Sequence, residues 1–281
     1  GRASPSSINA AWFPNLFWDG RATSQFTDPE TGLASLLTNA ALESQSVGPP
    51  VSSTEMAHDL RNWGQIETKL RDAKPMALAT AIPGDMAAAI AVNPTYPQLF
   101  TAAFGDSAIT ADRIARAIAT YERSLIPDQT PWDLFQAGNP AALTPQQVNG
   151  MNIFNGPGRC IICHTAGLFS DRGFHNLGLR QIADDNGRQA VTGNVADRGR
   201  FKTPSLRNVG LRGTLMHTGQ FTDLNQVVGF YNGGGGPNLD NKDPALIPLG
   251  LGPVQRGDLV NFLANGLTDP DHLVSGRRIT L

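Results

Sequence analysis

Both cysteines of the chain lie in one pentapeptide, Cys160-Ile161-Ile162-Cys163-His164. Two thiols two residues apart and followed by histidine form the C-x-x-C-H signature for covalent attachment of haem c, in which the thiols add to porphyrin vinyl groups and the histidine becomes an axial iron ligand. A thioredoxin-like redox pair would need a βαβ setting, and a zinc site would need more thiolates or paired histidines. Neither pattern accompanies the pentapeptide, which therefore predicts one covalent haem with His164 as a ligand.

The ligand opposite His164 decides the chemistry of such a haem. A strong sixth ligand favours electron transfer, whereas an open position favours reaction with peroxide or oxygen. Sequence distance alone does not rank the candidates, because loops bring axial ligands together. They are Met216, His217, His175, His58, His272, the tyrosines and the remaining methionines.

Composition indicates a globular, soluble chain of one large or two smaller domains, with 281 residues, 40% of them apolar, and a formal charge of −2. Since no Lys or Arg run stands out, we expect no nucleic-acid partner and no anionic membrane partner. No apolar stretch approaches the ~20 residues of a membrane span, and residues 1–5 lack a signal-peptide pattern. Haem c is attached outside the bacterial cytoplasm, so we expect a periplasmic or extracellular protein with a processed or truncated start.

Helical periodicity dominates the chain, and most of its 30 glycines and 20 prolines fall between the periodic segments. With no competing strand pattern, the sequence predicts an all-α, loop-rich fold. A capping box at Thr144-Pro145-Gln146-Gln147 predicts a helix that leads into the pentapeptide. The other predicted helices and their inward residues are about 54–73 (Met56, Leu60, Trp63, Ile66, Leu70), one capped by Thr110 (Ile114, Ala117, Ile118, Tyr121, Leu125), one begun by Thr222 (Leu224, Val227, Val228, Tyr231) and about 254–264 (Val254, Leu259, Val260, Leu263).

Several blocks, in the same order, resemble the C-terminal two-thirds of the bacterial di-haem cytochrome c peroxidase and MauG family. They are Phe17-Trp18-Asp19-Gly20-Arg21, Glu55-Met56, residues 117–123, the pentapeptide, and residues 174–178, 201–209, 216–219 and 227–232. The resemblance implies a cytochrome c-like fold. It assigns residues 1–140 to the remainder of the N-terminal, peroxidatic haem domain without its C-x-x-C-H, and residues 141–281 to the C-terminal cytochrome c domain.

The resemblance also implies an activity: a haem c oxidoreductase that uses hydrogen peroxide as oxidant and passes electrons through the His164 haem. An electron-donor protein or a protein substrate would be the other partner. The family carries two haems, so we expect this chain to be a fragment, with the first haem on a missing segment or a separate polypeptide. The alternative is a mono-haem electron-transfer cytochrome c without peroxidase activity.

Catalytic residues follow from the same alignment. Trp18 resembles the tryptophan between the two haems, although an ordinary buried tryptophan is the alternative. Gln45, Pro49 and Glu55 match the residues around the peroxide pocket of the first haem. Glu55 would act as acid and base in O–O cleavage, while the alternative is a carboxylate at a helix N-terminus.

Haem and metal contacts also follow from the resemblance. Tyr231 matches the sixth-ligand position and is our first choice, with Met216 second and core packing as the alternative for both. The expected polar contacts of the haem come from His175 and His217, with Lys202 and Arg207 pairing with propionates. A calcium ion would be held by Asn9, Arg212 and Thr214.

Overall fold

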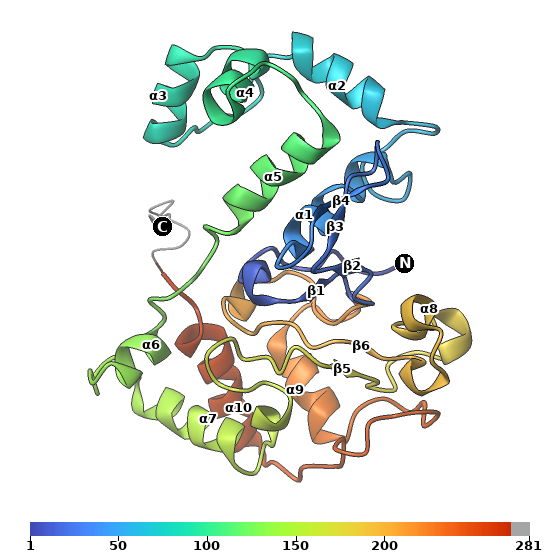
Figure 1. Ribbon diagram of the computed structural model, residues 1–281. Coiled ribbons are helices and arrows are strands. Elements are labelled where there is room, and N and C mark those ends of the chain that lie inside the picture. Colours follow the sequence, from blue (N-terminus) through green and yellow to red (C-terminus); the bar gives the residue numbers. More distant parts are fainter. Residues whose placement is uncertain (271–281) are drawn as a thin grey trace. The chain divides into compact units, whose positions relative to one another are not determined.

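The computed structural model describes residues 1–270, which form two compact units. Residues 1–21 and the chain from Arg123 onward make up unit 1, and residues 22–122 make up unit 2. Figure 1 shows the elements along the chain. This division into compact units differs from the predicted ranges 1–140 and 141–281. Those ranges were assigned to the two haem domains of the family, and that assignment stays a prediction. His272 lies outside the described residues.

Unit 1 is built around two helices that pack on each other, α7 (Pro145–Asn155) and α10 (Pro253–Asn261), followed by a π-helical turn at Phe262–Gly266. Gly150 makes the close approach possible, because a Cβ there would lie 2.1 Å from the carbonyl oxygen of Asp258. Phe154, Phe262 and Leu267 are fully buried at this contact, and α9 (Leu224–Asn232) adds Leu224 and Val228 to the same core.

Short elements complete unit 1. One antiparallel pair joins β5 (Phe174–His175) to β6 (Phe201–Lys202). The others are β1 (Asn15–Leu16), α6 (Pro131–Gln136), α8 (Gln189–Thr192) and the 3₁₀ turns η1 (Ala10–Trp12), η3 (Cys160–Ile162), η4 (Ile182–Asp184), η5 (Val195–Asp197) and η6 (Val209–Leu211).

Unit 2 packs α1 (Ala41–Ser46) against α5 (Ala111–Glu122), with the hairpin strands β3 (Phe26–Thr27) and β4 (Ala34–Leu36) beside them. Phe26 is fully buried against Ala40 and Ala115. A second small core forms between α2 (Trp63–Asp72) and α4 (Tyr96–Phe104). Its remaining elements are β2 (Ala22–Thr23), η2 (Pro49–Val51) and α3 (Gly84–Val92).

Helix prediction was most accurate where a cap accompanied the periodicity. The Thr144 capping box starts α7 as predicted, and the Thr110 hydroxyl accepts a hydrogen bond from the Arg113 N–H at the start of α5. The helix predicted from Thr222 begins two residues later, at Leu224, and the Asp223 side chain caps it. Helices make up most of the regular structure, which agrees broadly with the all-α prediction, although short paired strands are also present.

Three predicted apolar faces were wrong in part. The helix predicted from about residue 54 begins only at Trp63, because the φ of 59° at Leu60 is incompatible with a helix and Asn62 forms the capping box. Met56 and Leu60 are therefore exposed. On α5 the small residues Ala111, Ala115 and Ala119 are buried with Ile114. The predicted inward residues that are instead exposed there and on α10 are Ala117, Ile118, Tyr121 and Val254.

Candidate functional site

The pentapeptide follows α7 directly, through a turn that Gly156 and Gly158 close. Cys160 starts a 3₁₀ turn, and its carbonyl oxygen accepts a hydrogen bond of 2.8 Å from the His164 backbone N–H. The His164 ring places Nδ1 2.7 Å from the carbonyl oxygen of Phe169. A carbonyl only accepts, so Nδ1 carries the proton and Nε2 keeps its lone pair for a metal. His164 is thus held in the tautomer that an axial ligand requires.

A large cavity, named the haem-sized cavity below, opens beside this histidine. It encloses about 1400 Å³, including space open to solvent, and its wall is largely apolar. Cys160, Cys163 and His164 lie on the wall together with Tyr231 and Met216. The structure therefore brings together residues from three sequence blocks that are far apart in the chain. Its apolar lining includes Phe154, Phe201, Leu206, Val209, Leu215, Leu224, Val227, Val228, Leu246, Leu249, Leu259 and Leu263.

Within the described residues, two side chains on this wall have polar ends that no hydrogen bond or ion pair reaches. Nε2 of His217 is buried without a hydrogen bond, while the ring stacks on Phe201 at 3.7 Å. Lys202 is 7% exposed and lies over the Phe13 ring, and within residues 1–270 no ion pair reaches its ammonium. Burial lowers the pKa of His217 to about 4 and that of Lys202 to about 8. Because unsatisfied buried groups are costly, these two positions fit a ligand with acidic groups, as haem propionates are.

Both candidates for the sixth ligand lie on the cavity wall. Tyr231 comes from the last turn of α9, and burial raises the pKa of its phenol well above the usual value. A tyrosinate there would therefore depend on a metal ion to stabilise its charge. Met216 comes from a loop and has a φ of 66°. Geometry admits both residues, and Tyr231 remains our proposal.

Trp18 lies on the wall of the haem-sized cavity and also on that of a second cavity of about 700 Å³. Its indole N–H donates to the carbonyl oxygen of Ala3 at 2.8 Å, and its ring lies edge-on to His217 at 6.2 Å between centroids. Arg212 and Thr214 of the predicted calcium set line the second cavity. Asn9, the third, is buried and donates to the Ser205 hydroxyl at 3.4 Å. The calcium site itself stays a prediction.

Arg207 does not line the haem-sized cavity. Its guanidinium forms a two-point ion pair with Asp133, at 2.6 and 2.7 Å, and also donates to the carbonyl oxygens of Gly167 and Pro127. With its donors engaged, the guanidinium ties α6 to the loop that carries Phe169, the hydrogen-bond partner of His164. The structure thus gives Arg207 a supporting position, and its propionate contact stays a prediction.

The three residues expected at the peroxide pocket belong to unit 2. Gln45 is in α1 and Pro49 opens η2, and both are half-buried. The Met56 N–H donates to the Pro49 carbonyl oxygen at 3.3 Å, which draws the two segments together. Glu55 is exposed in a turn, and α2 begins only at Trp63, so the alternative of a helix N-terminal carboxylate was wrong. The acid-base role of Glu55 stays a prediction.

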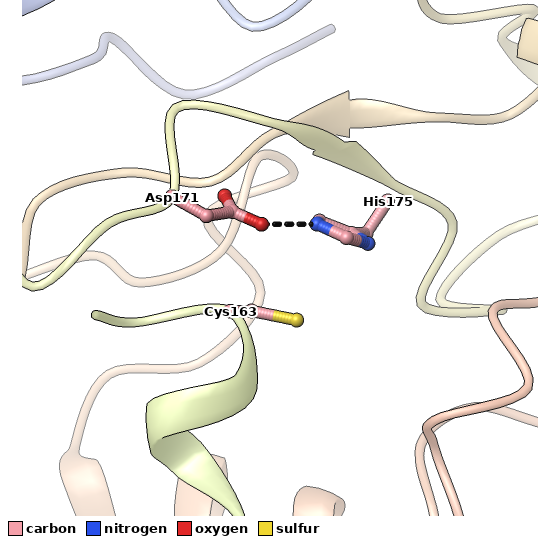
Figure 2. Close-up of side chains that lie close together, drawn as sticks. All are labelled: Cys163, Asp171 and His175. Carbon is pink, nitrogen blue, oxygen red and sulfur yellow. Dashed lines mark hydrogen bonds and ion pairs between the residues drawn. The ribbon is translucent and has the colours of Figure 1, made fainter.

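A charged cluster borders the cavity next to Cys163, and Figure 2 shows part of it. The ligand atoms of Cys163, Asp171 and His175 lie within 4.8 Å of one another, close enough for a metal site. However, His175 places Nε2 2.8 Å from Asp171 and Nδ1 2.6 Å from Asp243. Carboxylates accept from both ring nitrogens, which leaves no free lone pair for a metal ion. Sequence reasoning found His175 but missed both carboxylates, because only the fold brings Asp243 to the histidine.

Comparisons with known proteins agree with this geometry. The family model described as di-haem cytochrome c peroxidase matches residues 1–141. The cytochrome-c peroxidase IdrP1 of Denitromonas iodatirespirans is 33% identical over 74% of this chain and 65% of its own. The methylamine utilization protein MauG of Methylophilus methylotrophus is 31% identical over 93% of this chain and 67% of its own. The chain thus spans about two thirds of the length of these relatives.

Solved structures give the same result. The crystal structure of a MauG-like protein associated with microbial copper homeostasis superposes with a TM-score of 0.73 at 26% identity, covering 98% of this chain and 77% of that one. The diheme peroxidase BthA of Burkholderia thailandensis, at 21% identity, shares the fold with a TM-score of 0.68. No helix within the described residues has the length and apolar character to cross a membrane. The chain belongs to the di-haem cytochrome c peroxidase and MauG family.

Proposed function

We propose that this chain is a haem c oxidoreductase of the peroxidase type, using hydrogen peroxide as oxidant and exchanging electrons with a donor protein or a protein substrate. The observation that carries the proposal is the His164 tautomer, which presents Nε2 beside a mostly apolar cavity that the two thiols also line. The bound haem would supply one-electron redox chemistry and reaction with peroxide. Kinship with peroxidases favours this function over a simple electron-transfer cytochrome.

The side chains of unit 1 would hold and orient the cofactor. Cys160 and Cys163 would hold the haem through thioethers, and His164 and Tyr231 would bind its iron. Lys202 and His217 would donate to the propionates, which would give Nε2 of His217 the hydrogen bond that it lacks within the described residues. The apolar wall would exclude water from the macrocycle, which helps to set its potential.

Two further roles rest on the family alignment. Trp18, with its indole anchored on Ala3, would conduct electrons toward the His164 haem. Glu55, with Gln45 and Pro49, would accept and return a proton, while the family's other haem would supply the reaction with peroxide. We also propose a periplasmic location and a calcium ion near Asn9.

The test begins with an intact mass and a haem count on the protein produced in a host that attaches haem c. One covalent haem is expected from the single C-x-x-C-H. Peroxide is then added while the Soret and near-infrared bands are recorded, first with this chain and then with any co-purifying second haem polypeptide. If neither sample changes its spectrum, the peroxidase proposal is wrong and an electron carrier remains.

A further inference from the structure

His175 is held between two carboxylates at the edge of the haem-sized cavity. Asp171 lies 2.8 Å from Nε2, and Asp243 lies 2.6 Å from Nδ1. Each contact requires a proton on the nitrogen, so the ring is an imidazolium and the three side chains together carry one net negative charge. Neighbouring backbone N–H groups fix both carboxylates, from Gly173 to Asp171 and from Ala245 to Asp243.

The cluster is also joined to the haem-attachment motif. The Asp171 backbone N–H donates to the carbonyl oxygen of Cys163 at 2.7 Å, and the His175 ring lies within 4.8 Å of the Cys163 sulfur. His175 and Asp243 both form part of the cavity wall. Their side chains are less than a quarter exposed, so water screens their charges only partly. Other charges that face this region are Lys202, on the same wall, and Arg200, which acts on Asp243.

We infer that Asp171, His175 and Asp243 set the reduction potential of the haem attached at Cys163, by placing a fixed negative charge on its cavity wall. Reduction adds one electron and removes one positive charge from the iron. A nearby negative charge therefore stabilises the oxidised haem and lowers the potential. The positive charge of His175 raises the potential, whereas each carboxylate lowers it. The cluster therefore keeps the potential between the values that either kind of charge alone would give. This inference rests on the proposed haem attachment.

The test uses the haem-loaded chain, titrated with dithionite and mediators while the Soret band reports the ratio of oxidised to reduced haem. Asp243→Asn removes a negative charge and should raise the midpoint potential; it is measured at pH 6, below the ordinary pKa of histidine, with Asp171 still beside Nε2 of His175. His175→Gln removes the positive charge and should lower the midpoint potential; it is measured at pH 8, where both carboxylates are ionised. We expect about a tenfold change in the ratio for each, which is about 59 mV for one electron.

Asp240→Asn is the matched control. Asp240 is near Asp243 in the chain and loses the same charge, but its side chain is 62% exposed and pairs with Arg198. It should leave the potential nearly unchanged. Shifts of the same sign in the two cavity variants, or shifts no larger than that of the control, would overturn the inference. A wild-type chain with no covalent haem would instead overturn the proposed function, and the haem count separates the two failures.

Discussion

At the scale of single residues, Lys202 carries an electrostatic cost without a ligand, because its ammonium is buried. Burial lowers its pKa from 10.5 to about 8, so the folded state holds its proton less tightly than the unfolded state. Below pH 8 the Lys202 ammonium is charged in both the folded and the unfolded state, so the full cost of burying it reduces stability. Between pH 8 and 10.5 the unfolded state binds more protons, so the free energy of unfolding of the haem-free chain should rise by about 3 kcal/mol.

Urea denaturation of the haem-free chain across this pH range measures the effect. Tyrosine and cysteine titrate there too, so the comparison is with Lys202→Met, which should be more stable below pH 8 and should lack this contribution to the slope. A haem-loaded chain should also show less of it, because a propionate would compensate the ammonium. If the free energy of unfolding changes with pH equally in the wild type and in Lys202→Met, Lys202 carries no such cost.

Tyr231 can be tested as the sixth ligand by spectroscopy. Tyr231→Phe removes the phenol oxygen and should convert the ferric haem to a high-spin form in electron paramagnetic resonance. Tyr231→Met should raise the midpoint potential, because a neutral thioether stabilises ferric iron less than a tyrosinate does. Met216→Leu is the matched control on the same cavity wall and should leave the ligand signals unchanged. A high-spin signal in that variant would identify Met216 as the ligand instead.

The sequence predicted residues of the site where chemistry fixes their spacing. Cys160, Cys163 and His164 are recognisable alone, and the structure adds the Phe169 carbonyl that sets the histidine tautomer. That carbonyl could not have been predicted, because a backbone acceptor has no sequence signature. The same holds for Arg207, whose partner Asp133 lies in another element, 74 positions away.

At the scale of elements, the contact between α7 and α10 depends on a missing side chain. A Cβ at Gly150 would lie 2.1 Å from the Asp258 carbonyl oxygen and 2.7 Å from the Phe262 Cβ, both parts of the structure that cannot move alone. Gly150→Ala should therefore destabilise the protein by roughly 3 kcal/mol or more by forcing the helices apart.

Gly257→Ala is the matched control for this prediction. Gly257 is in α10, and nothing lies within 4 Å of the Cβ that it would gain. Since alanine favours a helix over glycine by about 1 kcal/mol, this variant should be neutral or more stable. Thermal unfolding of both variants gives the comparison. If Gly150→Ala melts at the same temperature as Gly257→Ala, the contact between α7 and α10 does not depend on the missing side chain at Gly150.

Element boundaries were predictable where side-chain caps announce them, as at Thr144 and Thr110. Periodicity alone predicted element boundaries and buried faces less well. Leu60 fits an apolar stripe, yet its backbone is left-handed and its side chain is 92% exposed. On α5 the buried face is lined by alanines because α1 packs against it, a partner that no local pattern reveals.

At the scale of the whole molecule, unit 1 is discontinuous in sequence, since residues 1–21 belong with the chain from Arg123 onward. Trp18 comes from the first of these segments, and the other residues around the haem-sized cavity come from the second. Gln45, Pro49 and Glu55 belong to unit 2. The units follow tertiary contacts and not chain order, so they differ from the predicted haem domains 1–140 and 141–281, which stay a prediction.

The division predicts that haem attachment and peroxide chemistry can be separated. Replacing residues 22–122 by a flexible Gly/Ser linker of about 20 residues should leave every described wall residue of the haem-sized cavity in place. The shortened chain should therefore still attach one haem, with the Soret and electron paramagnetic resonance spectra of the full chain. It should lose any response to peroxide that the full chain shows, alone or with a co-purifying haem polypeptide, because Gln45, Pro49 and Glu55 are gone. A Trp18→Phe variant of the full chain serves as control: it should attach haem equally well but exchange electrons more slowly. Loss of the covalent haem from the shortened chain, measured by mass and by the haem count, would mean that unit 2 is needed to form the site.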